Sequence, residues 1–111
     1  MSRHDDALPL RHMLDHGREI AALTAERQPG DLLSDRTFQL AVFHLFGILG
    51  EAANRVSRDF QRAHPEIDWR GIVGLRNYLL HSYDRIEMGT VWRTAREDVP
   101  ALVATLERIL R

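Results

Sequence analysis

Apolar residues recur at helical spacing along most of this chain, and three turn signals cut the pattern into four segments. The turn signals are Pro29-Gly30-Asp31, Ala63-His64-Pro65-Glu66 and Met88-Gly89-Thr90. No stretch alternates apolar and polar residues convincingly over the length of a strand. Because short connections favour antiparallel neighbours, the sequence predicts an all-α, up-and-down bundle of four to five helices in one domain, residues 1–111.

Each of the four segments is expected to form one helix. The first covers residues 6–26, and the second, central helix runs from an N-cap at Ser34 or Asp35 to Arg62. The third starts near Asp68, and the fourth covers residues 91–110. Because proline lacks an N–H and collides with the preceding turn, we expect Pro100 to kink the fourth helix or divide it.

The composition limits the classes of protein to which this chain can belong. Apolar residues make up 44% of the chain and charged residues 28%, as in ordinary globular domains. The absence of cysteine excludes disulfides and thiolate sites and fits a reducing compartment. No apolar run is long enough to span a membrane and the N-terminus lacks a signal-peptide core, so we expect a soluble, cytoplasmic protein.

The charge pattern suits phosphate chemistry at a local site. All 15 basic residues are arginines, which bind phosphate as planar, always-protonated donors. The net charge of −1 argues against a broad basic surface for long nucleic acids, and we expect no DNA partner. We therefore expect nucleic acid to bind at a small site on one chain, or at a site formed by two paired chains.

The third helix carries the main candidate site. Helical geometry places Asn77, His81 and Asp84 on one edge, opposite the apolar face, and the long stem of Arg76 can swing toward His81. An imidazole can move a proton while a guanidinium binds phosphate oxygens, which suits cleavage of RNA by its own adjacent hydroxyl. On spacing alone, Arg76 and His81 are more typical of a solvated helix surface than of an active site.

Motifs at residues 50–55, 65–70, 74–77, 80–84, 91–92 and 97–100 follow one another in order and span nearly the whole chain. Taken together, they resemble the HepT-like branch of the HEPN superfamily. This resemblance implies the toxin of a bacterial toxin–antitoxin pair, a metal-independent endoribonuclease with a motif of Arg, four to six residues and His. Arg76 and His81 match that motif as catalytic residues, and Asn77 matches the polar residue that follows the Arg.

The resemblance also implies partners and a modification. Family members act as homodimers in which two motifs face one cleft, with RNA as substrate and no cofactor. Tyr83 matches the tyrosine to which a minimal nucleotidyltransferase antitoxin attaches adenylate. A bulky anionic group beside Arg76 would occupy the anion site and repel RNA.

Other residues have a functional and a structural interpretation. Glu51 either supports catalysis by orienting Arg76 or His81, or forms a structural ion pair with Arg55. His44, on the same helix, is more typical of a core or interface residue than of a ligand. Further arginines before the motif either guide RNA or are merely solvated: Arg55, Arg58, Arg62 and Arg70.

The remaining candidates favour structural roles. His12 and His16 are four residues apart, but no third ligand pattern completes a metal site with them or with His4, so we expect no metal. Trp69 and Trp92 are typical of core or interface anchors rather than base-stacking residues. Two other functions stay open: a non-catalytic helical dimer that binds a nucleotidyltransferase or nucleotide, and a plain helical adaptor.

Overall fold

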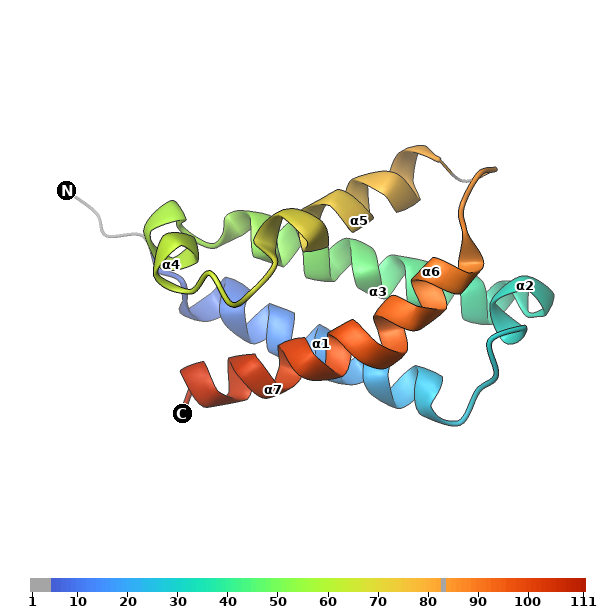
Figure 1. Ribbon diagram of the computed structural model, residues 1–111, viewed down its shortest axis with the longest axis horizontal. Coiled ribbons are helices and arrows are strands. Elements are labelled where there is room, and N and C mark those ends of the chain that lie inside the picture. Colours follow the sequence, from blue (N-terminus) through green and yellow to red (C-terminus); the bar gives the residue numbers. More distant parts are fainter. Residues whose placement is uncertain (1–4, 83) are drawn as a thin grey trace.

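The computed structural model describes residues 5–82 and 84–111, and every regular element in these ranges is helical. Four longer helices run lengthwise through a molecule of 50 × 28 × 20 Å (Figure 1): α1 (Ala7–Ala25), α3 (Arg36–Arg55), α5 (Trp69–His81) and α7 (Val99–Ile109). Shorter elements connect them: α2 (Asp31–Ser34), α4 (Arg58–Ala63), α6 (Met88–Arg93) and the π-helix η1 (Thr94–Asp98). The prediction of an all-helical bundle is confirmed.

The bundle is closed on three sides. Helix α1 packs against α3 and α7, and α3 also packs against α5. In the described part of the chain, α5 and α7 are not packed together to a comparable extent, and Figure 1 shows them on opposite edges of α3. The fourth side of the bundle is therefore open.

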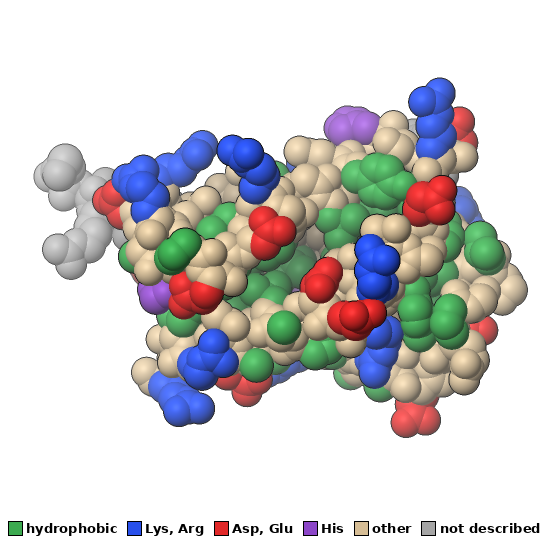
Figure 2. Space-filling view, in the orientation of Figure 1, with side chains coloured by type: hydrophobic (Ala, Val, Ile, Leu, Met, Phe, Trp, Pro, Cys, Tyr) green, Lys and Arg blue, Asp and Glu red, His purple; other side chains and the backbone are tan. Residues whose placement is uncertain are grey.

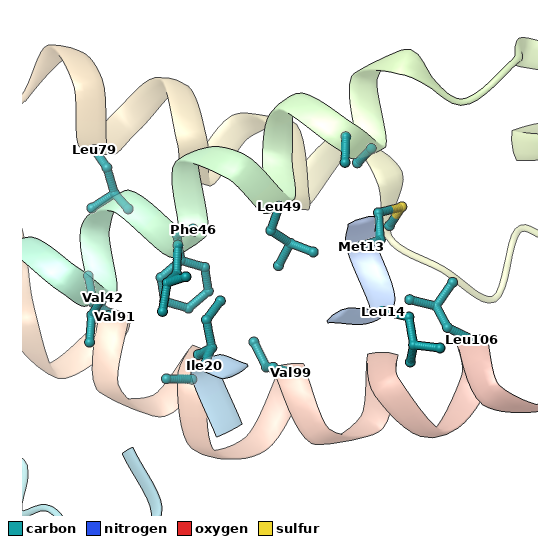
Figure 3. Close-up of a cluster of buried hydrophobic side chains, with 14 of the residues drawn as sticks. Met13, Leu14, Ile20, Val42, Phe46, Leu49, Leu79, Val91, Val99 and Leu106 are labelled. Atoms are coloured by element: carbon teal, nitrogen blue, oxygen red, sulfur yellow. The ribbon is translucent and has the colours of Figure 1, made fainter. Parts of the chain in front are cut away.

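The core lies between α1, α3 and α7, and side chains of α5 and α6 add to it (Figure 3). Met13, Ile20 and Val42 are completely buried, and Leu49 is 2% exposed. Burial of each such side chain contributes about 1.5–3 kcal/mol relative to exposure. The apolar residues that recur at helical spacing are thus mostly buried in the core or packed against it, although Leu23 of α1, which belongs to that pattern, is 37% exposed.

The predicted central helix is two helices. Helix α3 begins at the predicted N-cap Asp35, whose side chain accepts a hydrogen bond from the Phe38 N–H, but it ends at Arg55. Val56 is extended and buried, and Ser57 caps the separate helix α4. The Asp6 carboxylate accepts hydrogen bonds from the backbone N–H and the hydroxyl of Ser57 at 2.8 and 2.7 Å. This contact between residues 51 positions apart in the sequence stabilises the break between α3 and α4.

The third predicted turn is wrong. Helix α5 ends at His81 and α6 begins at Met88, so Met88-Gly89-Thr90 opens α6. Met88 packs against the core, which favours helix over turn at this point. The last helical run is divided, as Pro100 predicts: the wider π-helical turn η1 precedes α7, and Pro100 lies in the first turn of α7.

Candidate functional site

Helix α5 carries the central site residues and has well-defined ends. Asp68 caps its first turn, with its side chain accepting a hydrogen bond from the Gly71 N–H, and Trp69 and Leu79 anchor its inner face in the core. The helix ends at His81, with Ser82 as C-cap. Asp84 is therefore not on the helix, and the predicted edge is reduced to Asn77 and His81.

A glycine allows α5 to approach α3 closely at Arg76. A Cβ added to Gly50 would lie 2.4 Å from the Cβ of Arg76 and 3.2 Å from the carbonyl oxygen of Ile72. The first carbons of the Arg76 stem thus run over the backbone of α3. This contact fixes where the Arg76 side chain leaves the helix.

Two side chains hold the Arg76 guanidinium. Its Nη1 donates to the Asn77 side-chain oxygen at 3.0 Å, and its Nη2 lies 3.3 Å from a carboxylate oxygen of Glu51. The Arg76 and Glu51 side chains are 32% and 45% exposed. Partly exposed ion pairs contribute little stability, so the main effect of this pair is orientation. The guanidinium is turned toward the Asn77 edge and stays accessible to a ligand.

Glu51 contacts Arg76 as well as Arg55, and its role in catalysis stays a prediction. Its other carboxylate oxygen accepts a hydrogen bond from Arg55 at 3.2 Å, so Glu51 bridges Arg55 on α3 and Arg76 on α5. The structure describes both Glu51 and His81, and these two side chains do not form an ion pair.

His81 lies at the exposed end of the same edge of α5. It is four residues beyond Asn77, so the two side chains project from the same edge of the helix. In the described part of the chain, no side chain hydrogen-bonds its ring, which leaves the ring open to a substrate. Tyr83, the expected modification site, lies outside the described residues.

Tyr78 makes a structural contact near the site that the sequence does not predict. Its hydroxyl donates to the Arg85 carbonyl at 3.0 Å and accepts from the Glu87 N–H at 2.8 Å. These bonds tie Arg85 and Glu87 back onto α5. No local signal marks this role, because it depends on where these two residues fold back.

The other candidates are spread over the surface. Arg58 and Arg70 are exposed and, with Arg62, line a shallow pocket of about 380 Å³ between α4 and the start of α5. His44 is exposed, which excludes the core position, whereas the interface position stays a prediction. It lies seven residues before Glu51 and on the same edge of α3.

The remaining histidines and tryptophans show structural contacts. The His16 ring bonds the His12 carbonyl at 2.7 Å, and no group of three metal-ligating side chains gathers within the described residues. His4 lies outside those residues. Trp69 is buried, packs edge-on against Phe60 and donates to the His64 carbonyl, while Trp92 packs partly buried against the core. Both tryptophans are core anchors, as expected.

A sizeable cavity lies away from Arg76 and His81. It is a groove of about 590 Å³ on the open side of the bundle, between α5 and α7, and Figure 2 shows its green apolar floor. None of Arg76, Asn77 and His81 lines it, since they project from the other side of α5. At its rim, the Glu66 backbone N–H holds the pKa of the Glu66 carboxyl below its ordinary value, against the effect of burial and with a smaller share from His64.

In the described part of the chain, no helix is long and apolar enough to cross a membrane.

Comparisons with known proteins place the chain in a family. The ribonuclease HepT-like family matches residues 13–109. A probable ribonuclease HepT of Thermococcus cleftensis is 38% identical over 79 residues, covering 71% of this chain and 72% of the relative. A candidate RNase of Methanocaldococcus jannaschii is 29% identical over 107 residues, covering 96% and 98%. No solved structure gives a significant match. Sequence and all-helical fold agree, and the chain belongs to the ribonuclease HepT-like family.

Proposed function

We propose that the protein is a metal-independent endoribonuclease, the toxin of a toxin–antitoxin pair, with Arg76 and His81 as its catalytic residues. The observation that carries the proposal is the direction of the Arg76 guanidinium. Its bond to Asn77 turns it toward the edge of α5 on which His81 lies. Arg76 and His81 leave the helix in different directions, and this turn lets both reach one phosphodiester.

The arrangement suits attack by the ribose 2′-hydroxyl on the adjacent phosphorus. The 2′-oxygen forms a bond to phosphorus while the bond to the 5′-oxygen of the next nucleotide breaks, which leaves a 2′,3′-cyclic phosphate and a 5′-hydroxyl. His81 exchanges a proton with the attacking or the leaving oxygen, and Arg76 binds the equatorial phosphate oxygens as negative charge develops. Asn77 and Glu51 hold the guanidinium in place.

The test is cleavage of a structured RNA, in the presence of a chelator, by the wild type and by the Arg76→Ala and His81→Ala variants. We expect each variant to lose about a hundredfold or more in kcat, the usual range for a catalytic acid–base or oxyanion-stabilising group. Arg93→Gln, an exposed arginine on α6, serves as control. Equal activity in the wild type and both alanine variants would refute the proposal. No cleavage together with a tightly bound partner would favour the non-catalytic interaction module.

The proposed active form is a homodimer. Leu40 and Leu80 are 50% and 48% exposed. Leu40 lies eleven residues before Glu51 on the same edge of α3, and Leu80 lies four residues after Arg76 on α5. Exposed leucines on the face that carries the Arg76–Glu51 pair support a second copy there, which would bring two motifs to one cleft.

The proposed control of activity is adenylylation of Tyr83 by a nucleotidyltransferase partner. The tyrosine hydroxyl would attack the α-phosphate of ATP and release pyrophosphate. Tyr83 is two residues beyond His81, so the added phosphate would compete with RNA for the same basic group. The intact mass of the protein co-expressed with its neighbouring gene tests this. We expect an increase of one or more adenylates that is absent from Tyr83→Phe, and an unchanged wild-type mass would contradict it.

A further inference from the structure

Four residues of α5 form one continuous edge that leads from α4 to His81. Arg70, Gly74, Asn77 and His81 follow one another at intervals of four, three and four residues, which keeps them on one side of a helix. At 1.5 Å per residue, Arg70 and His81 are about 16 Å apart along the helix axis. That length suits an extended strand of several nucleotides.

The middle of this edge carries no side chain, because Gly74 occupies it. Gly74 is exposed, and a Cβ added there would meet nothing within 4 Å. A sugar–phosphate chain can therefore approach the backbone of α5 between Arg70 and Asn77. Gly74 also borders the groove between α5 and α7, so it marks the crest between the two surfaces.

Arginines gather at the far end of the edge. Arg58, Arg62 and Arg70 surround the shallow pocket beside α4, and Figure 2 shows basic side chains gathered over this end of the molecule. Among the residues that the structure describes, no carboxylate lies within ion-pair distance of Arg58 or Arg70. Arg62 pairs with Asp59, but these side chains are 72% and 91% exposed, so a phosphate can displace the carboxylate at little cost.

The acidic residue of the pocket is already engaged. Asp68 accepts a hydrogen bond from the Gly71 N–H at 3.0 Å as the N-cap of α5. Its charge is thus directed at the positive end of the helix. The guanidinium groups of Arg58 and Arg70 are left as the phosphate donors, and guanidinium binds phosphate in a bidentate manner.

We propose that this edge and the adjoining arginine pocket form the track on which a single RNA strand runs to the cleavage site, with Arg58 and Arg70 binding phosphates several nucleotides away from the scissile one. The inference rests on the proposed function, since it assigns a direction and an anchor to the RNA. A single strand is favoured over a duplex because one narrow edge, and no broad basic surface, carries the charge.

The experiment compares wild type with Arg58→Gln, Arg70→Gln and the double variant on single-stranded RNAs from about four to about twenty nucleotides. We expect KM in the double variant to rise about tenfold or more on the longest RNA, with a penalty that grows with RNA length. The slope of log KM against log salt concentration should fall by about 0.7 for each phosphate contact removed. Arg93→Gln, outside the track, should keep the wild-type KM and slope.

Direct binding separates this proposal from the proposed function. Binding of a 2′-O-methyl RNA, which has no free nucleophile, is measured with the same proteins. Weakened, less salt-dependent binding in the double variant supports the track even if the wild type cleaves nothing. If the double variant binds the RNA with wild-type affinity and wild-type salt dependence, the track is overturned. This holds even where the protein cleaves RNA, or where the variant loses a protein partner instead.

Discussion

Glu51 connects two arginines that belong to different helices, and its removal tests how far Arg76 depends on its neighbours. Without Glu51, the Arg76 guanidinium keeps only Asn77 as a side-chain partner among the described residues. We expect Glu51→Ala to lower kcat about tenfold or more, because small misplacements of a catalytic group are costly. Glu51→Gln, which keeps one acceptor oxygen, should recover part of this loss.

The matched control is Asp15→Ala, since Asp15 pairs with the exposed Arg11 four residues away within α1. The Glu51 effect should fall on kcat at matched concentrations of folded protein, because a general loss of folded protein would also lower the apparent kcat. An equal loss in Glu51→Ala and Asp15→Ala would contradict a positioning role for Glu51.

Asp35 predicts a pH dependence of stability. The hydrogen bond from the Phe38 N–H, and next the Arg27 side chain at 2.6 Å, hold the pKa of the Asp35 carboxyl below its ordinary value. A carboxyl with a lowered pKa in the folded state stabilises the protein above the unfolded pKa of about 4, and this contribution is lost as the pH falls through the folded pKa. Urea unfolding below about pH 4 should therefore show a steeper loss of stability in wild type than in Asp35→Asn.

Asparagine still caps the helix but carries no charge, so it isolates the titration from the cap itself. Parallel pH profiles for the two proteins would show that Asp35 does not contribute.

At the residue scale, the sequence predicts the edge that joins Asn77 to His81, because helical geometry fixes it. It does not determine which way the Arg76 stem swings: Asn77 and Glu51 decide that, and Glu51 belongs to another helix. The hydroxyl of Tyr78 is a similar case, since its partners lie in a segment without regular spacing.

At the scale of the elements, Gly50 sets the distance between α3 and α5. The Cβ in Gly50→Ala would collide with the Cβ of Arg76, which cannot rotate away, so α5 must shift. We expect a loss of about 1–3 kcal/mol in the free energy of unfolding, as for other overpacked contacts, together with reduced cleavage.

Gly47→Ala on the same helix is the control, because nothing lies within 4 Å of its added Cβ. There the higher helix propensity of alanine should stabilise the protein by about 0.5–1 kcal/mol. Two similar changes in urea unfolding would contradict the close approach at Gly50.

Element boundaries follow from the sequence only where the deciding contact is local. The caps Asp35 and Asp68 and the effect of Pro100 are examples, since each acts within a few residues. The break at Val56 depends on Asp6, which is distant in the sequence, and the start of α6 depends on packing of Met88. Both were therefore predicted wrongly.

At the scale of the whole molecule, the proposed dimer has to place two motifs in one cleft. A substitution that prevents dimer formation should therefore also reduce RNA cleavage. Leu40 lies on the same edge of α3 as Glu51, and a C2 interface would bury it twice, for about 1.5–3 kcal/mol per side chain. We expect Leu40→Asp to sediment as a monomer and to lose at least about tenfold in cleavage at a concentration at which wild type is dimeric. Leu8→Asp is the control, because Leu8 is 64% exposed but lies on α1. A monomeric Leu40→Asp that cleaves RNA at the wild-type rate would show that one chain holds the complete site.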